Sequence, residues 1–152
     1  MSQGGPHVST DDDVIRIRLT VAGGRALVWS LLTEAAHIAR WWGEYVAFEP
    51  GPDGQLVERW RDGDREVVTR GSVTEWRPPS ALAMTWADDG WPAGTRLRIC
   101  LSGEGDRTDL ALDHDGWAAF PNADRQALIR AHADGWSHHM ASLSAYAAKQ
   151  SP

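Results

Sequence analysis

The sequence is poor in several residue types that define common protein classes. Cys100 is the only cysteine among 152 residues, which excludes a disulfide framework and a cysteine-rich metal site. No apolar run approaches the roughly 18 residues that a membrane-spanning helix needs. The N-terminus lacks the pattern of a secretory signal peptide. We therefore expect a cytoplasmic protein with no membrane insertion.

Lysine is also scarce, and the basic residues do not outnumber the acidic ones. Lys149 is the single lysine among 15 basic residues, so the other 14 are arginines. The formal net charge is −6 at pH 7, whereas a nucleic-acid-binding protein normally carries a basic patch. Arg16 and Arg18 alternate with apolar residues, as on the solvated face of a strand. We expect no nucleic-acid partner.

Tyrosine and phenylalanine occur only twice each, but there are nine tryptophans. Indole rings bury a large area and keep a polar N–H group, which suits either a bulky core or the wall of a cavity. Nine exceeds what a core of this size requires. We expect several of the tryptophans to line an aromatic-rich pocket and the others to fill the core.

The N-terminal third predicts an arm, a strand and two small helices. Residues 1–12 are polar and rich in glycine and serine, so we predict a disordered arm ahead of a single domain over residues 13–152. Within residues 14–22, apolar and polar side chains alternate from Ile15 to Val21, as in a half-buried strand. After a Gly-Gly break, two short helices are predicted at residues 26–32 and 34–42.

The remainder predicts a β meander followed by one long helix. Residues 45–115 contain short strand-like runs bounded by Pro, Gly and Asp, with a hairpin turn at residues 62–64. Residues 122–149 then predict a helix of about seven turns. Strands joined by tight turns form an antiparallel sheet. The fold class is therefore α+β, with six to seven strands curved around the C-terminal helix.

Four segments in this order resemble the START-like SRPBCC superfamily, within the branch named for the activator of the ninety-kilodalton heat-shock ATPase. They are VWSLLTEAAHIARWWG, GSVTEWRPPSALAMTW, TRLRICL and GWSHHMASLSAY. The resemblance covers roughly residues 14–148. It implies a helix-grip fold, in which a curved antiparallel sheet wraps a long C-terminal helix and leaves a cavity between them.

The resemblance implies several functions rather than one. Members of the superfamily bind lipids, polyketides and other hydrophobic small molecules. We expect no cofactor for this chain. Some members cyclise or aromatise polyketides, some protect enediyne producers from their toxic product, and some assist the chaperone ATPase. We expect a binder of a hydrophobic, aromatic or polyketide-like molecule that exists as a monomer or weak dimer. A polyketide cyclase, an enediyne self-resistance protein and a chaperone-activating interaction module remain alternatives.

Three histidines in the segment HADGWSHHM are the most conspicuous candidate site. On a helix centred on Trp136, His132 and His139 fall on the apolar side and His138 on the opposite side. His132 and His139 are separated by roughly 10.5 Å along the axis, too far for one metal ion with His–metal bonds near 2.0–2.1 Å. We predict no metal site here. The two inward histidines are either satisfied core residues or polar points on a cavity wall.

The predicted ligand-binding residues combine the tryptophans near the cavity with the inward face of the helix. They are Trp41, Trp42, Trp60, Trp86, Trp136, His132, His139 and Met140.

The acid–base candidates are His132, His139 and His114, should the protein be an enzyme. His114 follows Leu110 and Leu112 at period two, which points it along the same strand face. Glu58 shares a face with Leu56 and Trp60. Because burying an unpaired carboxylate is costly, we expect Glu58 at a solvent-exposed strand edge.

Overall fold

The computed structural model describes residues 5–150, and within them eight strands and three α-helices. The strands are β1 (His7–Ser9), β2 (Ile15–Ala22), β3 (Val46–Phe48), β4 (Gln55–Asp62), β5 (Arg65–Arg77), β6 (Ala81–Asp88), β7 (Thr95–Ser102) and β8 (Arg107–Asp115). The helices are α1 (Arg25–Thr33), α2 (Ala35–Trp41) and α3 (Asn122–Gln150), with 3₁₀ turns at Asp11–Asp13 and Trp117–Ala119.

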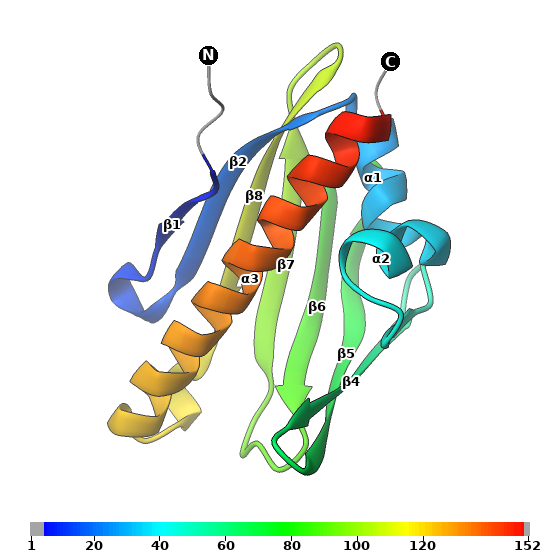
Figure 1. The fold of residues 1–152 in the computed structure, drawn as a ribbon. Coiled ribbons are helices and arrows are strands. Elements are labelled where there is room, and N and C mark those ends of the chain that lie inside the picture. Colours follow the sequence, from blue (N-terminus) through cyan, green and yellow to red (C-terminus); the bar gives the residue numbers. More distant parts are fainter. Residues whose placement is uncertain (1–4, 151–152) are drawn as a thin grey trace.

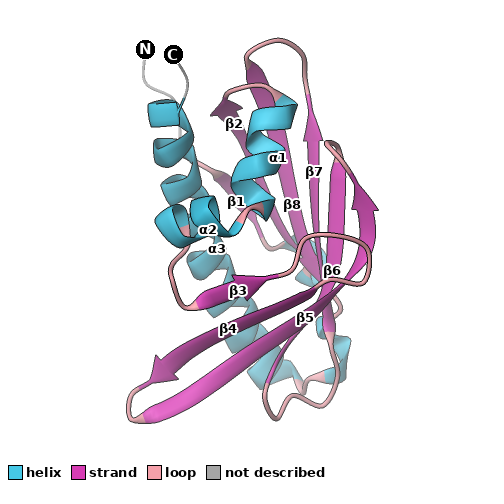
Figure 2. Cartoon of the chain, turned by 90° about the vertical axis from the view of Figure 1, so that its right-hand side faces the viewer, coloured by secondary structure: helices cyan, strands magenta, loops and turns pink. Residues whose placement is uncertain are grey.

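The strands form one antiparallel sheet in the order β1-β2-β8-β7-β6-β5-β4-β3. Neighbours in the sheet are mostly neighbours in sequence, as short turns dictate. The exception is the pairing of β2 with β8, which joins the first long strand to the last. Figure 2 shows that the sheet is curved, with β3, β4 and β5 running at an angle to β2, β7 and β8. The predicted α+β helix-grip class is confirmed.

Helix α3 lies across one face of the sheet, with α1 and α2 beside its C-terminal part (Figure 1). Its buried side chains recur at helical spacing and include Ile129, Trp136, Met140 and Leu143. They meet the alternate side chains of the strands, such as Ile15 on β2, which is fully buried. The core therefore lies between the sheet and α3.

The sequence prediction was wrong for part of the N-terminal arm. His7–Ser9 form β1 and pair antiparallel with β2, with Val8 opposite Ile17. Without β1, the outer side of β2 would expose a row of unpaired backbone groups at the sheet edge. The side-chain pattern does not reveal such a strand, because its hydrogen bonds to β2 are made by the backbone. Residues 1–4 of the predicted arm lie outside the described residues.

Two short strands account for the difference between the six to seven strands predicted and the eight observed. β1 and β3 have three residues each, which is too short for alternation to distinguish a strand from a loop. The long strands were predicted correctly, including the hairpin turn between β4 and β5 at Gly63, whose φ of 63° suits glycine.

Candidate functional site

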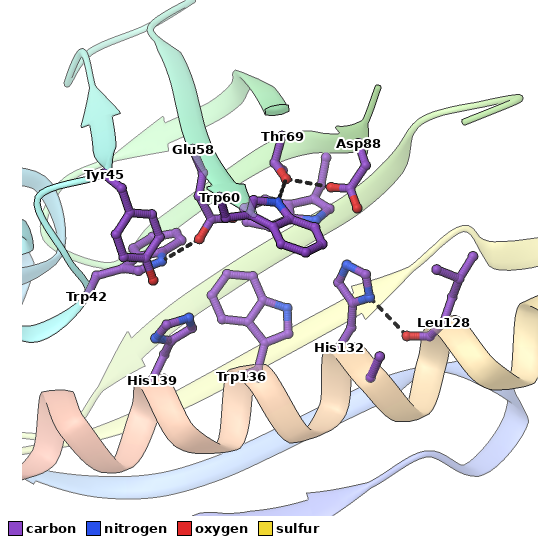
Figure 3. Close-up of a pocket in the computed structure, with 13 residues that line it drawn as sticks. Trp42, Tyr45, Glu58, Trp60, Thr69, Asp88, Leu128, His132, Trp136 and His139 are labelled. Atoms are coloured by element: carbon purple, nitrogen blue, oxygen red, sulfur yellow. Dashed lines mark hydrogen bonds between the residues drawn. The ribbon is translucent and has the colours of Figure 1, made fainter. Parts of the chain in front are cut away.

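A cavity of about 400 Å³ lies between α3 and the part of the sheet formed by β4, β5 and β6. Figure 3 shows side chains from both walls pointing toward one another across it. The helical wall consists of Leu128, Ala131, His132, Gly135, Trp136 and His139. The sheet wall consists of Glu58, Trp60, Thr69, Trp86 and Asp88, with Trp42 and Tyr45 at the side nearest α2. The helical positions recur every three or four residues and therefore occupy one face of α3.

Three tryptophans, one directly after α2, one on β6 and one on α3, form an aromatic cluster in this cavity. The ring centroids of Trp42 and Trp136 are 5.5 Å apart, and those of Trp86 and Trp136 are 5.0 Å apart. Trp42 and Trp86 stack nearly parallel at 6.2 Å. These separations are those of favourable aromatic pairs. The cluster gives the cavity a rigid apolar side.

Trp136 is fixed by a buried chain of hydrogen bonds through His114. The Trp136 indole N–H donates to His114 Nδ1 at 3.0 Å, and indole can only donate, so Nδ1 carries no proton. The Thr95 hydroxyl donates to the Trp86 carbonyl at 2.7 Å. Its oxygen therefore accepts from His114 Nε2, also at 2.7 Å. These bonds assign the neutral Nε2–H tautomer to His114.

His114 is thus a supporting residue behind the cavity wall rather than part of the wall. It is fully buried, and burial, with a smaller contribution from His132, holds its pKa well below the usual value. Both of its ring nitrogens are already bonded. Its predicted position on the inward face of the strand is correct, but it has no free nitrogen to offer a ligand.

Glu58 contradicts the sequence expectation that it is exposed. Its side chain is buried, with only 8% of the residue accessible to solvent. The Trp42 indole N–H donates to Glu58 Oε2 at 3.0 Å, which supplies part of the missing solvation. Burial nevertheless raises the pKa of Glu58 to about 7, against the lowering effect of the Trp42 bond. The face that Glu58 shares with Leu56 and Trp60 turns inward, and the hydrogen bond from Trp42 allows the carboxyl group to be buried there.

A second carboxyl group, Asp88, lies on the same wall. The Thr69 hydroxyl donates to Asp88, and the Trp60 indole N–H donates to Thr69 Oγ1 at 3.0 Å. Burial raises the pKa of Asp88. The sheet register explains why the groups meet, because Glu58 pairs with Thr69 and Thr69 pairs with Asp88 across β4, β5 and β6. The three side chains form one cross-strand row.

The two inward histidines of α3 reach the cavity from the opposite side. His132 bonds the Leu128 carbonyl through Nδ1 at 2.9 Å, so Nδ1 is the donor and Nε2 carries no proton. Burial lowers the pKa of His132, and it lowers the pKa of His139 to about 4. His138 is exposed, as predicted. Both cavity histidines are therefore neutral near pH 7.

No cluster of three or more metal-ligating side chains is found within residues 5–150. In the same range, no helix combines the length and apolarity needed to cross a membrane.

The comparisons with known proteins match this chain at the level of the family. A family described as "Activator of Hsp90 ATPase homolog 1-like protein" matches residues 24–148. The chain belongs to this family. The resemblance drawn from the sequence is confirmed, while no curated protein sequence matches the chain.

Solved structures support the same fold for this chain. DynU16, from the dynemicin biosynthetic locus, has a TM-score of 0.73 at 20% identity over 93% of this chain, which spans 49% of DynU16. CalU16 from Micromonospora echinospora has a TM-score of 0.71 at 21% identity, covering 99% and 88% of the two chains. The Aha1 dimer from Colwellia psychrerythraea has a TM-score of 0.70 at 17% identity. The match covers 88% of this chain and 95% of the Aha1 chain. At these identities the likeness shows the fold alone.

The structure brings together six of the eight residues predicted to bind a ligand. Lining the cavity are Trp42, Trp60, Trp86, Trp136, His132 and His139. Trp41 and Met140 are core residues instead. The Trp41 indole N–H donates to the Leu31 carbonyl at 2.7 Å, which turns the ring into the core. Met140 is fully buried one turn beyond Trp136, where only about 20 Å³ of space remains.

Besides Glu58, sequence reasoning missed three polar side chains, one glycine and the apolar residues Leu128 and Ala131 in the wall. Asp88 follows Trp86 at period two, so the signal that placed Trp86 inward also applied to Asp88. Thr69 had no comparable signal, because its position depends on the register with β4. Tyr45 and Gly135 also line the cavity. Gly135 leaves open space, since a Cβ built there would meet no atom within 4 Å.

Proposed function

We propose that the protein binds a hydrophobic, aromatic small molecule in the cavity between α3 and the sheet. The observation that carries the proposal is a space of about 400 Å³ bordered by four tryptophans and a few convergent polar groups. Small-molecule sites have this volume and this mixture of apolar walls and placed polar atoms. The cytoplasmic location expected from the sequence remains a prediction.

The aromatic wall supports binding because it is held in place before a ligand arrives. The Trp42 N–H is bonded to Glu58, that of Trp60 to Thr69, and that of Trp136 to His114. A side chain that is already fixed loses little conformational freedom when a ligand packs on it. A flat ring system inserted among these indoles would gain contact area at a low entropic cost.

Gly135 allows this proposal to be tested without disturbing the fold. Gly135→Leu would place a side chain in open space on the helical wall. We expect the affinity for 1-naphthalenemethanol, a neutral probe, to fall by about tenfold or more. The new leucine would fill space that the probe otherwise occupies, and burying an apolar group of that size contributes about 1.5–3 kcal/mol. Calorimetry and the nine indole N–H resonances in NMR measure binding.

Ala141→Leu provides the matched control, since Ala141 is exposed on the same helix. It should leave the affinity unchanged. Both variants should fold, and Gly135→Leu should be more stable by about 0.5–1 kcal/mol because leucine is the better helix former. Equal affinity of the probe for wild type and Gly135→Leu, or no binding of the probe at all, contradicts a ligand site in this cavity.

Acid–base catalysis, as in a polyketide cyclase, is a second candidate function. It is favoured by the pKa of Glu58, which lies at about 7 and suits proton transfer near neutral pH. His132 and His139 face the same cavity. For a linear poly-β-ketone substrate, we expect Glu58→Gln to lower turnover by about 10²-fold or more. Unchanged turnover in Glu58→Gln, His132→Ala and His139→Ala would remove this candidate.

A further inference from the structure

The described ionisable side chains on the sheet wall of the cavity are acidic, with no basic partner among them. Glu58 is at least nine-tenths buried, and Asp88 lies in the same cross-strand row. Of the residues that the structure describes, no lysine or arginine lines the cavity. The opposite wall offers His132 and His139, which burial keeps neutral. The site therefore holds two carboxyl groups without a cationic partner on the wall.

This arrangement discriminates between ligands of opposite charge. A buried carboxylate is stabilised by a cation or a strong hydrogen-bond donor and is destabilised by a second anion. The faces of Trp42, Trp86 and Trp136 also attract cations, because the indole ring has a negative face. A ligand carboxylate would meet repulsion at Glu58 and Asp88. The cavity is suited to a cation beside an aromatic body.

We propose that the ligand is an aromatic amine whose protonated nitrogen binds Glu58 and Asp88 while its rings pack among Trp42, Trp86 and Trp136. The inference rests on the proposed function, because it requires the cavity to bind a ligand. It narrows the expected ligands by excluding fatty acids and aromatic carboxylates. The ammonium group replaces the solvation that both carboxylates lost on burial.

The groups around the two carboxyls set the pH dependence of this binding. Facing Glu58 are Tyr45 and Asp88, and Asp88 in turn lies near Asp89, Arg65 and His132. The Tyr45 pKa is raised, so that residue stays neutral between pH 6 and pH 8. Glu58 has a pKa of about 7 and ionises across this interval. A cation binds the ionised form, so amine affinity should rise from pH 6 to pH 8.

Three probes with the same naphthalene body test the charge preference. They are 1-naphthylmethylamine, 1-naphthalenemethanol and 1-naphthoate, measured by calorimetry at pH 8. We expect the amine to bind about tenfold or more tightly than the alcohol, since hydrogen bonds to charged groups contribute about 1.5–3 kcal/mol. The naphthoate should bind most weakly. The amine affinity, and not the alcohol affinity, should fall when the pH is lowered to 6.

Isosteric variants assign the preference to the two carboxyls. Glu58→Gln keeps an oxygen acceptor for Trp42, and Asp88→Asn keeps one for Thr69, so both should fold. Each should remove most of the advantage of the amine over the alcohol. Glu66→Gln is the matched control, because Glu66 is exposed on β5 and its loss changes the net charge equally. It should leave the preference intact.

The possible outcomes separate this inference from the proposed function. Equal affinities for the three probes, or tighter binding of naphthoate, overturn the inference and leave a ligand site in place. A preference for the amine that survives both Glu58→Gln and Asp88→Asn also overturns it. Failure of all three probes to bind overturns the proposed function, and the inference with it.

Discussion

Tryptophan N–H groups donate hydrogen bonds to the two most buried titratable residues. Trp42 donates to Glu58, and Trp136 donates to His114. Indole has no acceptor, so each partner must present a lone pair. For Glu58, the hydrogen bond favours the ionised form while burial favours the neutral one. For His114, the hydrogen bond and burial both favour the neutral form. Aromatic residues thus shape the electrostatics of the site as well as its walls.

Replacing His114 should change the pH dependence of stability. The folded protein keeps His114 neutral, while the unfolded chain protonates it near pH 6.5, so stability from this residue is present above pH 6.5 and is lost below it. The loss is about 1.4 kcal/mol per pH unit. His114→Gln should cost about 2–3 kcal/mol at pH 7.5, and the deficit should shrink by about 2 kcal/mol at pH 5.

Urea unfolding of wild type and His114→Gln at both pH values measures this difference. His138→Gln is the matched control, because His138 is exposed on α3. Its unfolding free energy should follow that of wild type at each pH. A deficit in His114→Gln that is the same at pH 7.5 and pH 5 would contradict a histidine held neutral in the fold.

At the scale of elements, the close pairing of β5 with β6 is what assembles the cross-strand row of carboxyls. Gly71 on β5 is buried, and a Cβ built on it would lie 2.4 Å from the Thr85 carbonyl oxygen on β6. A backbone atom cannot move aside as a side chain can. The register shifts shortly afterwards, between Val73 and Glu75, as at a β-bulge. Glycine at this position permits the strands to approach.

Gly71→Ala should therefore destabilise the sheet. The clash of the new methyl group with the Thr85 carbonyl should lower the free energy of unfolding by about 2–4 kcal/mol. Chemical denaturation measures the loss. In Gly94→Ala the added Cβ would meet open space on an exposed loop, and the change should stay within about 0.5 kcal/mol. Equal stabilities of the two variants would refute the close approach of β5 and β6.

At the scale of the whole molecule, the described surface has few large apolar side chains. Val8 and Tyr45 are the exposed ones within residues 5–150, at 37% and 43%. Stable association generally requires a larger contiguous apolar patch. Tyr45 also belongs to the cavity wall, which gives its exposure a reason other than a subunit interface.

We therefore predict a monomer at micromolar concentration. Sedimentation equilibrium should give the mass of one chain, 16.7 kDa, with at most weak concentration dependence. A mass of twice that value at low micromolar concentration would show a stable dimer. Tyr45→Ser would then indicate whether the dimer covers the cavity, because it should weaken association only in that case.

Periodicity predicted the long strands and α3 but not the three-residue strands. The strict alternation of Ile15 and Ile17 with arginines predicted β2, and the spacing of Trp136, Met140 and Leu143 predicted the inward face of α3. β1 and β3 have no pattern of their own, since their backbones are paired by neighbours. Pattern also failed to separate Trp41 from Trp42. Their side chains point about 100° apart on a helix, but only the packing around them shows which one enters the core.

The sequence by itself determined the fold class and the direction in which each long element turns its side chains, because these depend on local spacing and composition. The family followed from the resemblance of its segments to known members. The tertiary structure alone decided which side chains meet. Sheet register placed Glu58, Thr69 and Asp88 in one row, and packing closed the core around Trp41 and Met140 while leaving space at Gly135. Register and packing arise from contacts between residues far apart in the chain, which local periodicity does not encode.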